Sequence, residues 1–140
     1  MTDARVEKVY ADRVRAREFL EQADRFRGDA DTPDLSAESQ SVLLHNAAIC
    51  ACDAILQAAG QRVTSGDNAH ALRLETALEH LEGDTEELLE SLDASRERRN
   101  EASYAAAFVA KASLADAREA TTELLERVRA LIGREEVVPE

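Results

Sequence analysis

Apolar residues recur every three or four positions along most of the chain, which is the spacing of amphipathic helices. Glycines at 28, 60, 83 and 133 and the polar loop GDADTPDL interrupt this pattern. Because glycine and loop residues commonly end helices, the pattern predicts an all-α fold. We expect an up-down helical bundle of four to five helices, over residues 2–27, 36–59, 67–82, from 84 through RRNEASY (98–104), and 113–132.

The second predicted helix, residues 36–59, is apolar on most of its circumference. Such a helix either lies at the centre of a bundle or packs against a second subunit. Its less apolar residues follow one another at steps of four, three and four and so form one stripe: Asn46, Cys50, Asp53 and Gln57. The stripe is either the solvent-exposed side of the helix or part of the wall of a site. Because polar residues are usually exposed, the solvent-exposed interpretation is favoured.

Length and composition indicate a single domain. The chain has 140 residues and is rich in Ala, Leu, Glu and Arg, which favour helices. We expect one helical-bundle domain over residues 1–133 and a flexible tail over 134–140. The N-terminus carries charges at nearly every turn, and the apolar stretch 47–59 is interrupted by Asp53 and too short to cross a bilayer. The sequence therefore predicts a cytoplasmic protein without a membrane segment.

The formal net charge of −12 opposes nonspecific binding to nucleic acid. Eight acidic residues and no basic one lie between Leu74 and Ser95. We interpret this run as a solvated face; the alternative is a surface for a basic protein partner.

Neither cysteine nor histidine follows the spacing of a metal site. Cys50 and Cys52 lie two residues apart without a second cysteine pair, and the three histidines, at 45, 70 and 80, lack zinc-ligand spacing. The sequence predicts two free thiols packed as small hydrophobic groups, no metal and no cofactor.

Residues 98–104, RRNEASY, place charged and polar side chains where the helical pattern calls for apolar ones. On an ideal helix Arg99 continues the stripe of Leu88 and Leu92, with Arg96 nearby. A guanidinium there needs acceptors, either from a buried carboxylate such as Asp53 or Glu75 or from a ligand phosphate. Both interpretations stay open.

Three stretches resemble the HEPN family of small helical bundles: LLHNAAICACDAILQAAGQR, GDNAHALRLETALEHL and RRNEASYAAAFVAKASLADAREATTELLERV. The resemblance covers roughly residues 10–132. It implies a homodimer, and in many members a metal-independent ribonuclease that uses an arginine followed, four to six residues later, by a histidine. Here Tyr104 occupies the histidine position.

Since tyrosine is a poor acid or base at neutral pH, the resemblance with this replacement favours a non-catalytic module that binds a nucleotide or RNA phosphate. In that module Arg99 contacts phosphate with Arg96 beside it, Asn100 hydrogen-bonds, and Tyr104 stacks or offers its hydroxyl. Asp53 and Asn46 are possible supporting residues. One alternative is a ribonuclease toxin held by an antitoxin, with Tyr104 or a histidine from another helix in the catalytic role. The other is a protein-interaction bundle using the acidic face 74–95.

Overall fold

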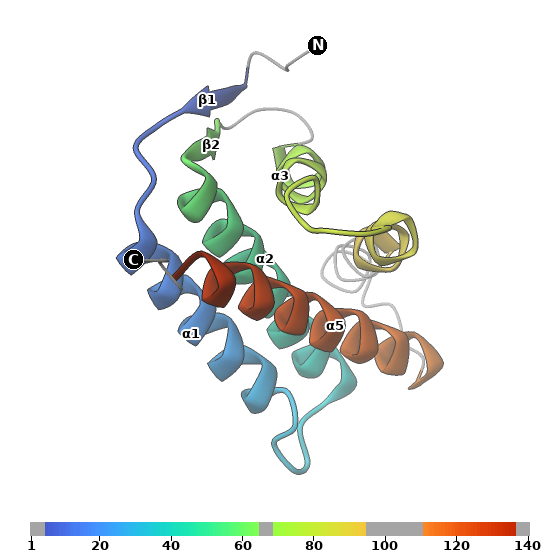
Figure 1. Ribbon diagram of the computed structural model, residues 1–140. Helices are drawn as coiled ribbons and strands as arrows, with labels where there is room; N and C mark the ends of the chain where they lie inside the picture. Colours follow the sequence, from blue (N-terminus) through green and yellow to red (C-terminus); the bar gives the residue numbers. More distant parts are fainter. Residues whose placement is uncertain (1–4, 65–68, 95–110, 137–140) are drawn as a thin grey trace.

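The computed structural model describes residues 5–64, 69–94 and 111–136 of the chain. In these ranges five helices pack together, and a small two-stranded sheet lies at one end of them (Figure 1). The helices are α1 (Arg13–Asp29), α2 (Ala37–Ala59), α3 (Ala69–Leu78), a helix over residues 86–94, and α5 (Lys111–Glu136). The expected helical bundle is thus present in its main features.

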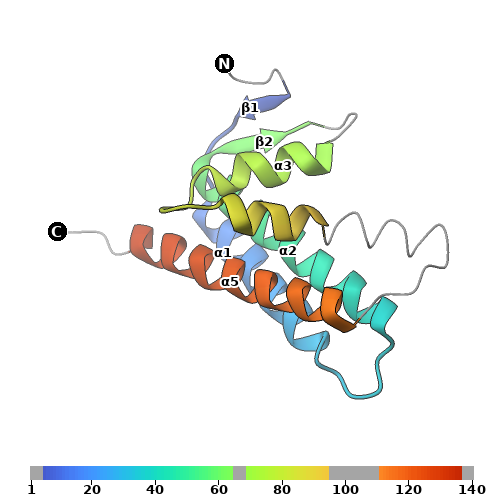
Figure 2. The same cartoon turned by 90° about the vertical axis from the view of Figure 1, so that its right-hand side faces the viewer.

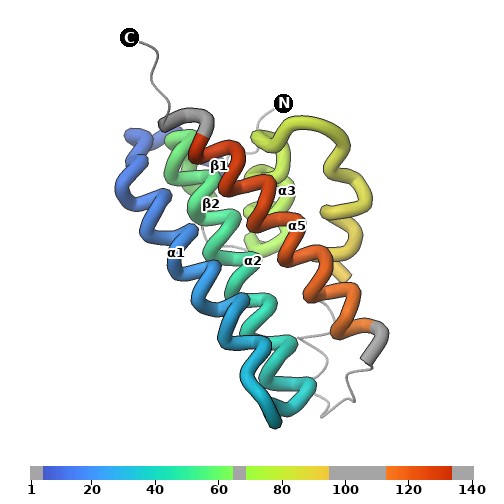
Figure 3. The backbone as a smooth tube through the Cα atoms, turned by 60° about the horizontal axis from the view of Figure 1, so that its bottom comes forward, coloured from blue at the N-terminus to red at the C-terminus, as the bar shows by residue number. Residues whose placement is uncertain are grey.

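Helix α2 lies at the centre. It packs most extensively against α1, which runs beside it, and then against α5 and α3 (Figures 1 and 3). Figure 2 shows α3 and the 86–94 helix next to each other on the side of the sheet. Much of the apolar surface of α2 is therefore buried by the other described helices, while Val42, Leu43 and Ile49 are half-buried.

By length and composition alone, α2 is the single helix in the described ranges that could cross a membrane. The central helix of a helical bundle passes the same test. In the most apolar window of α2, 44% of the residues are buried inside the protein, against the neighbouring helices.

The prediction of one helix over residues 2–27 is wrong at its N-terminal part. Strand β1 (Val6–Lys8) pairs antiparallel with β2 (Gln61–Val63), with Val6 opposite Val63, and α1 begins only at Arg13. Two backbone hydrogen bonds, Val9 N to Gly60 O and Asp12 N to Gln57 O, both of 2.9 Å, continue the attachment to the end of α2. The fold is therefore mostly helical rather than all-α.

Two large apolar residues of the segment predicted as the first helix are accordingly outside the core. Tyr10 is 98% exposed and Val9 is 39% exposed. Helix α1 starts at Arg13 because the Asp12 carboxylate accepts a hydrogen bond from the Arg15 N–H and so caps the first turn.

The predicted ends of α2 are confirmed, and those of α3 and α5 are not. Ser36 caps α2 through its side chain, and Gly60 ends it in the left-handed conformation with a φ of 72°. Helix α3 stops at Leu78 instead of continuing to residue 82. Helix α5 continues through Gly133 to Glu136, since a single glycine weakens a helix by only about 1 kcal/mol and does not break it.

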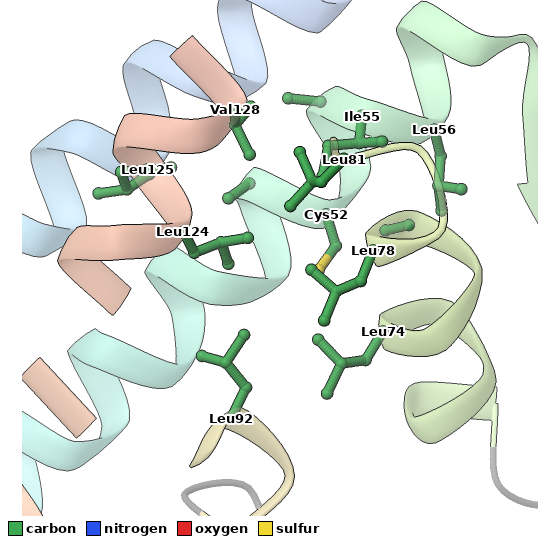
Figure 4. Packing of buried hydrophobic residues seen from close by; sticks show 14 of the residues in the cluster. Cys52, Ile55, Leu56, Leu74, Leu78, Leu81, Leu92, Leu124, Leu125 and Val128 are labelled. Carbon is green, nitrogen blue, oxygen red and sulfur yellow. The ribbon is translucent and has the colours of Figure 1, made fainter. Parts of the chain in front are cut away.

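The main core lies where α2, α3, α5 and the 86–94 helix face one another (Figure 4). Ile55 of α2 and Leu124 and Val128 of α5 are completely buried, and Leu78 of α3 is 2% exposed. Burial of a leucine or isoleucine side chain contributes roughly 1.5–3 kcal/mol. This shared core fixes the position of α3 relative to α2, on which the candidate site depends.

Candidate functional site

Four of the residues predicted to form a phosphate site, Arg96, Arg99, Asn100 and Tyr104, lie outside the described residues. The two supporting residues, Asn46 and Asp53, both lie half-buried on α2. Among the described side chains Asp53 has a cationic neighbour in Arg73, on α3. Glu75, the other carboxylate considered for a buried pair, is exposed.

Beside Asp53 a cavity of about 30 Å³ lies between α2, α3 and the 86–94 helix. Most of its wall is apolar, and the polar part comes from two histidines, an arginine and a thiol. It is lined by His45, Ala48, Ile49, Cys52, His70, Arg73, Leu74 and Leu92. Figure 4 shows the Cys52 sulfur pointing into the space between α2 and α3.

The helical repeat explains which side chains reach this cavity. On α2, residues 45, 48, 49 and 52 are spaced by three, four and seven and share one face. On α3, His70, Arg73 and Leu74 are spaced in the same way. Packing of these two faces brings His45 and His70 together, with ring centroids 6.5 Å apart and ring planes at 66°. The sequence interpretation that gave the histidines no common site missed this pairing.

Asp53 and Arg73 form an ion pair at the edge of the cavity. Arg73 Nε lies 3.6 Å from Asp53 Oδ1, and the two side chains are 26% and 28% exposed. Burial raises the pKa of Asp53 above its usual value, although the charges of Arg73 and His70 act in the opposite direction. The carboxylate is thus held in a place that costs it hydration.

The two cysteines are free thiols, with Cys52 buried and Cys50 half-buried. Burial raises the pKa of Cys52 to about 12, and the nearby Asp53 charge adds to this effect. Burial and Asp53 also raise the pKa of Cys50. Because the thiolate is the nucleophile, a thiol with so high a pKa is a poor partner for His45 or His70 in nucleophilic catalysis.

The third histidine has a different environment. His80 Nε2 lies 2.6 Å from the Gln61 side-chain oxygen, so this histidine ties the end of α3 to β2. In the described parts of the chain, no three His, Cys, Asp or Glu side chains are grouped so that they could hold a metal ion.

The acidic run is exposed. Within residues 74–94 every acidic side chain except Asp93 is exposed. A second hollow of about 320 Å³ lies between the 86–94 helix and α5, and its carboxylates are Glu87, Asp116, Glu119 and Glu123.

The polar groups of the cavity wall are two imidazoles, a guanidinium and a thiol, and the Asp53 carboxylate lies beside the guanidinium. Imidazoles gain or lose a proton near neutral pH, and a guanidinium is a permanent cation suited to phosphate or carboxylate oxygens. Together they can bind a compact anion. No protein family, curated protein or solved structure matches the chain.

Proposed function

We propose that this chain is an HEPN-like, dimeric, up-down helical module that binds a nucleotide or RNA phosphate without cleaving it. The observation that carries the proposal is the convergence of His45, His70 and Arg73 on one cavity. These side chains supply one fixed positive charge and two that can form when an anion is present. The position of the cavity at the protein surface lets a phosphate reach them, since His70 is exposed.

The arginine-rich segment belongs to the same proposal. Leu92, which lines the cavity, precedes Arg96 by four residues and Arg99 by seven in the sequence. We propose that Arg96, Arg99, Asn100 and Tyr104 contact the remainder of the ligand. The dimer rests mainly on the family resemblance, because the described helices already bury much of α2 within one chain.

The proposal is tested with the full chain and a fluorescently labelled RNA oligonucleotide carrying a 5′-phosphate, at low salt. We expect Arg73→Gln to weaken binding by about tenfold, since removal of one charge-assisted contact costs roughly 1.5–3 kcal/mol. Arg129→Gln is the matched control. Arg129 is 54% exposed and pairs with Asp24 away from the cavity, so its loss should leave binding nearly unchanged.

Equal losses in Arg73→Gln and Arg129→Gln would mean that binding depends on overall charge and would contradict a site at the cavity. The same samples give the mass by light scattering. A mass near 15.4 kDa would remove the dimer from the proposal.

A ribonuclease is the second candidate, and the contact between His45 and His70 favours it. Two histidines beside a phosphate can divide the roles of base and acid in metal-independent RNA cleavage. Cleavage of the labelled RNA that disappears in His45→Gln or His70→Gln would establish this candidate over the non-cleaving module. An antitoxin partner would then be expected.

A protein-interaction bundle is the third candidate, and the acidic hollow beside Glu87 and Glu119 favours it. Its expected partner is a basic protein segment. If the RNA oligonucleotide does not bind at low salt and Glu119→Gln weakens the capture of a lysine-rich peptide, this candidate replaces the first.

A further inference from the structure

The summed charge of the described side chains at the cavity is equal and opposite to that of a phosphate dianion. When both imidazoles carry a proton, the charges of the described residues are three positive, from His45, His70 and Arg73 on the cavity wall, and one negative, from Asp53 beside Arg73, a sum of +2. A phosphate monoester carries about −1.5 to −2 at pH 7. An internal phosphodiester carries −1. We infer that this cavity recognises a terminal phosphate monoester in preference to a diester, an inference that rests on the proposed function.

The size of the cavity favours a single compact group. Its volume of about 30 Å³ is that of two or three water-sized groups, because one water needs roughly 10–15 Å³ by the same measure. A nucleobase or ribose does not fit there. The group that reaches His45, His70 and Arg73 is therefore the end of a ligand, and the rest of the ligand lies outside.

Asp53 provides the discrimination. Its carboxylate already lies 3.6 Å from Arg73, so any anion that approaches this guanidinium competes with a negative charge held in place. A diester has the same charge as the Asp53 carboxylate, so it gains little free energy by replacing that carboxylate beside Arg73. A dianion is attracted more strongly to the arginine and the two histidines, and so overcomes the repulsion by Asp53.

The histidine pair adds to the preference. The rings of His45 and His70 have centroids 6.5 Å apart, and two imidazolium charges at that distance repel each other unless an anion lies against them. Among the described residues, the ionisable groups that the cavity or its electrostatics bring beside the pair are Arg73 on α3 and Cys52 and Asp53 on α2, while the 86–94 helix contributes Leu92 to the cavity. A dianion stabilises the doubly protonated pair more than a monoanion does.

The test compares two dinucleotides that share one internal diester: pApA, which has a 5′-phosphate, and ApA, which lacks it. Calorimetric titration of the full chain at low salt should show pApA binding at least about tenfold tighter, a difference of 1.4 kcal/mol. His70→Gln and Arg73→Gln should reduce the ratio of the two affinities toward one. His70 is exposed, so the first variant keeps the fold even if the second does not.

Two further variants sharpen the test. Asp53→Asn should raise the affinity for ApA more than that for pApA, because the repulsion that rejects the diester is removed. His80→Gln, whose histidine follows the end of α3 and contacts Gln61, should keep the tenfold ratio.

Equal binding of ApA and pApA by the unmodified protein would overturn the monoester inference and leave the proposed phosphate binding in place. Binding of neither dinucleotide would overturn both. A ratio that survives in His70→Gln and in a folded Arg73→Gln would also overturn the inference, since the preference would then arise elsewhere.

Discussion

The two sides of α2 hold their charged residues in different ways. On the side of α1 and α5, Asp31 accepts from Arg27 at 2.9 Å and lies 3.2 Å from Arg118, while Arg129 reaches Asp24 at 2.6 Å. The pairs with Arg118 and Arg129 connect α5 with α1 or the residues that follow it, at the surface. On the side of α3, the charged pair lies beside a cavity and a pair of histidines.

The two sides differ in whether their carboxylates keep their hydration: those near α1 and α5 do so largely, and the one near α3 does not. Asp31 and Asp24 are about half exposed and keep much of their hydration. Asp53 is less exposed, and burial raises its pKa in spite of Arg73 and His70. Groups kept where they are costly are more often found at functional sites than on structural surfaces. The side of α3 is therefore where we place the function.

The largest expected effects concern the apolar core. Leu124→Ala on α5 removes a fully buried side chain and should lower the free energy of unfolding by about 4 kcal/mol. Leu92→Ala, on the wall of the cavity, should cost only about 2 kcal/mol, because Leu92 already faces an incompletely filled space. Urea denaturation of the two variants measures both values. Equal losses would show that the two sides are packed equally well.

A backbone position gives the next largest effect. Gly60 has a φ of 72°, and an added Cβ would lie 2.8 Å from the Val9 carbonyl oxygen. Gly60→Ala should destabilise the fold by about 2–3 kcal/mol, through left-handed strain and displacement of the N-terminal segment.

Gly28→Ala is the matched control for this position. It lies in α1, where an added Cβ meets nothing within 4 Å, and should stabilise the protein by about 0.5–1 kcal/mol. A Gly60→Ala variant as stable as the unmodified protein would mean that the attachment of residues 5–12 to the end of α2 contributes little.

Local chemistry made part of this structure predictable. Ser36 and Gly60 bound α2 as the sequence indicated, since caps act within a few residues of the helix end. The pairing of Val6 with Val63 joins residues 57 positions apart (63 − 6), which no local pattern specifies. From local spacing alone, the N-terminal residues therefore fit the apolar pattern of a helix.

The candidate site divides in the same way. The sequence indicates Asp53 as a candidate, because it belongs to a polar stripe on an otherwise apolar helix. His45 and His70 each lie on a face that helical spacing defines, but their contact depends on how α2 packs against α3. That packing is set by core residues such as Ile55 and Leu78, which carry no sign of the site.

A smaller effect tests the surface pairs on the side of α1. Asp31→Asn weakens contacts to two arginines, Arg27 and Arg118, and should cost about 0.5–1 kcal/mol in low salt, since Asp31 is 55% exposed. Asp24→Asn weakens one contact, to Arg129, and should cost less than about 0.5 kcal/mol. Added salt should reduce both losses. Losses that do not change with salt would mean that the hydrogen bonds of the two carboxylates, and not their charges, connect these helices.

A change in stability of similar size is expected at Asp53, and its sign distinguishes the two sides of α2. Because the folded-state pKa of Asp53 is raised, its contribution to stability is fully present below the ordinary aspartate pKa of about 3.9 and is lost as pH rises through the folded value. Asn resembles the protonated acid at every pH. Asp53→Asn should thus gain stability relative to the unmodified protein between pH 4 and pH 7, by less than about 1 kcal/mol.

Asp31→Asn is the comparison for this pH dependence, because it removes a carboxylate paired at the surface and should not gain stability as pH rises. Urea denaturation of both variants at pH 4 and pH 7 measures the difference. If Asp53→Asn instead loses stability as pH rises, the ion pair with Arg73 outweighs the cost of burial. Asp53 would then hold α3 against α2 as Asp31 holds α1 near α5, and the electrostatic contrast between the two sides of α2 would disappear.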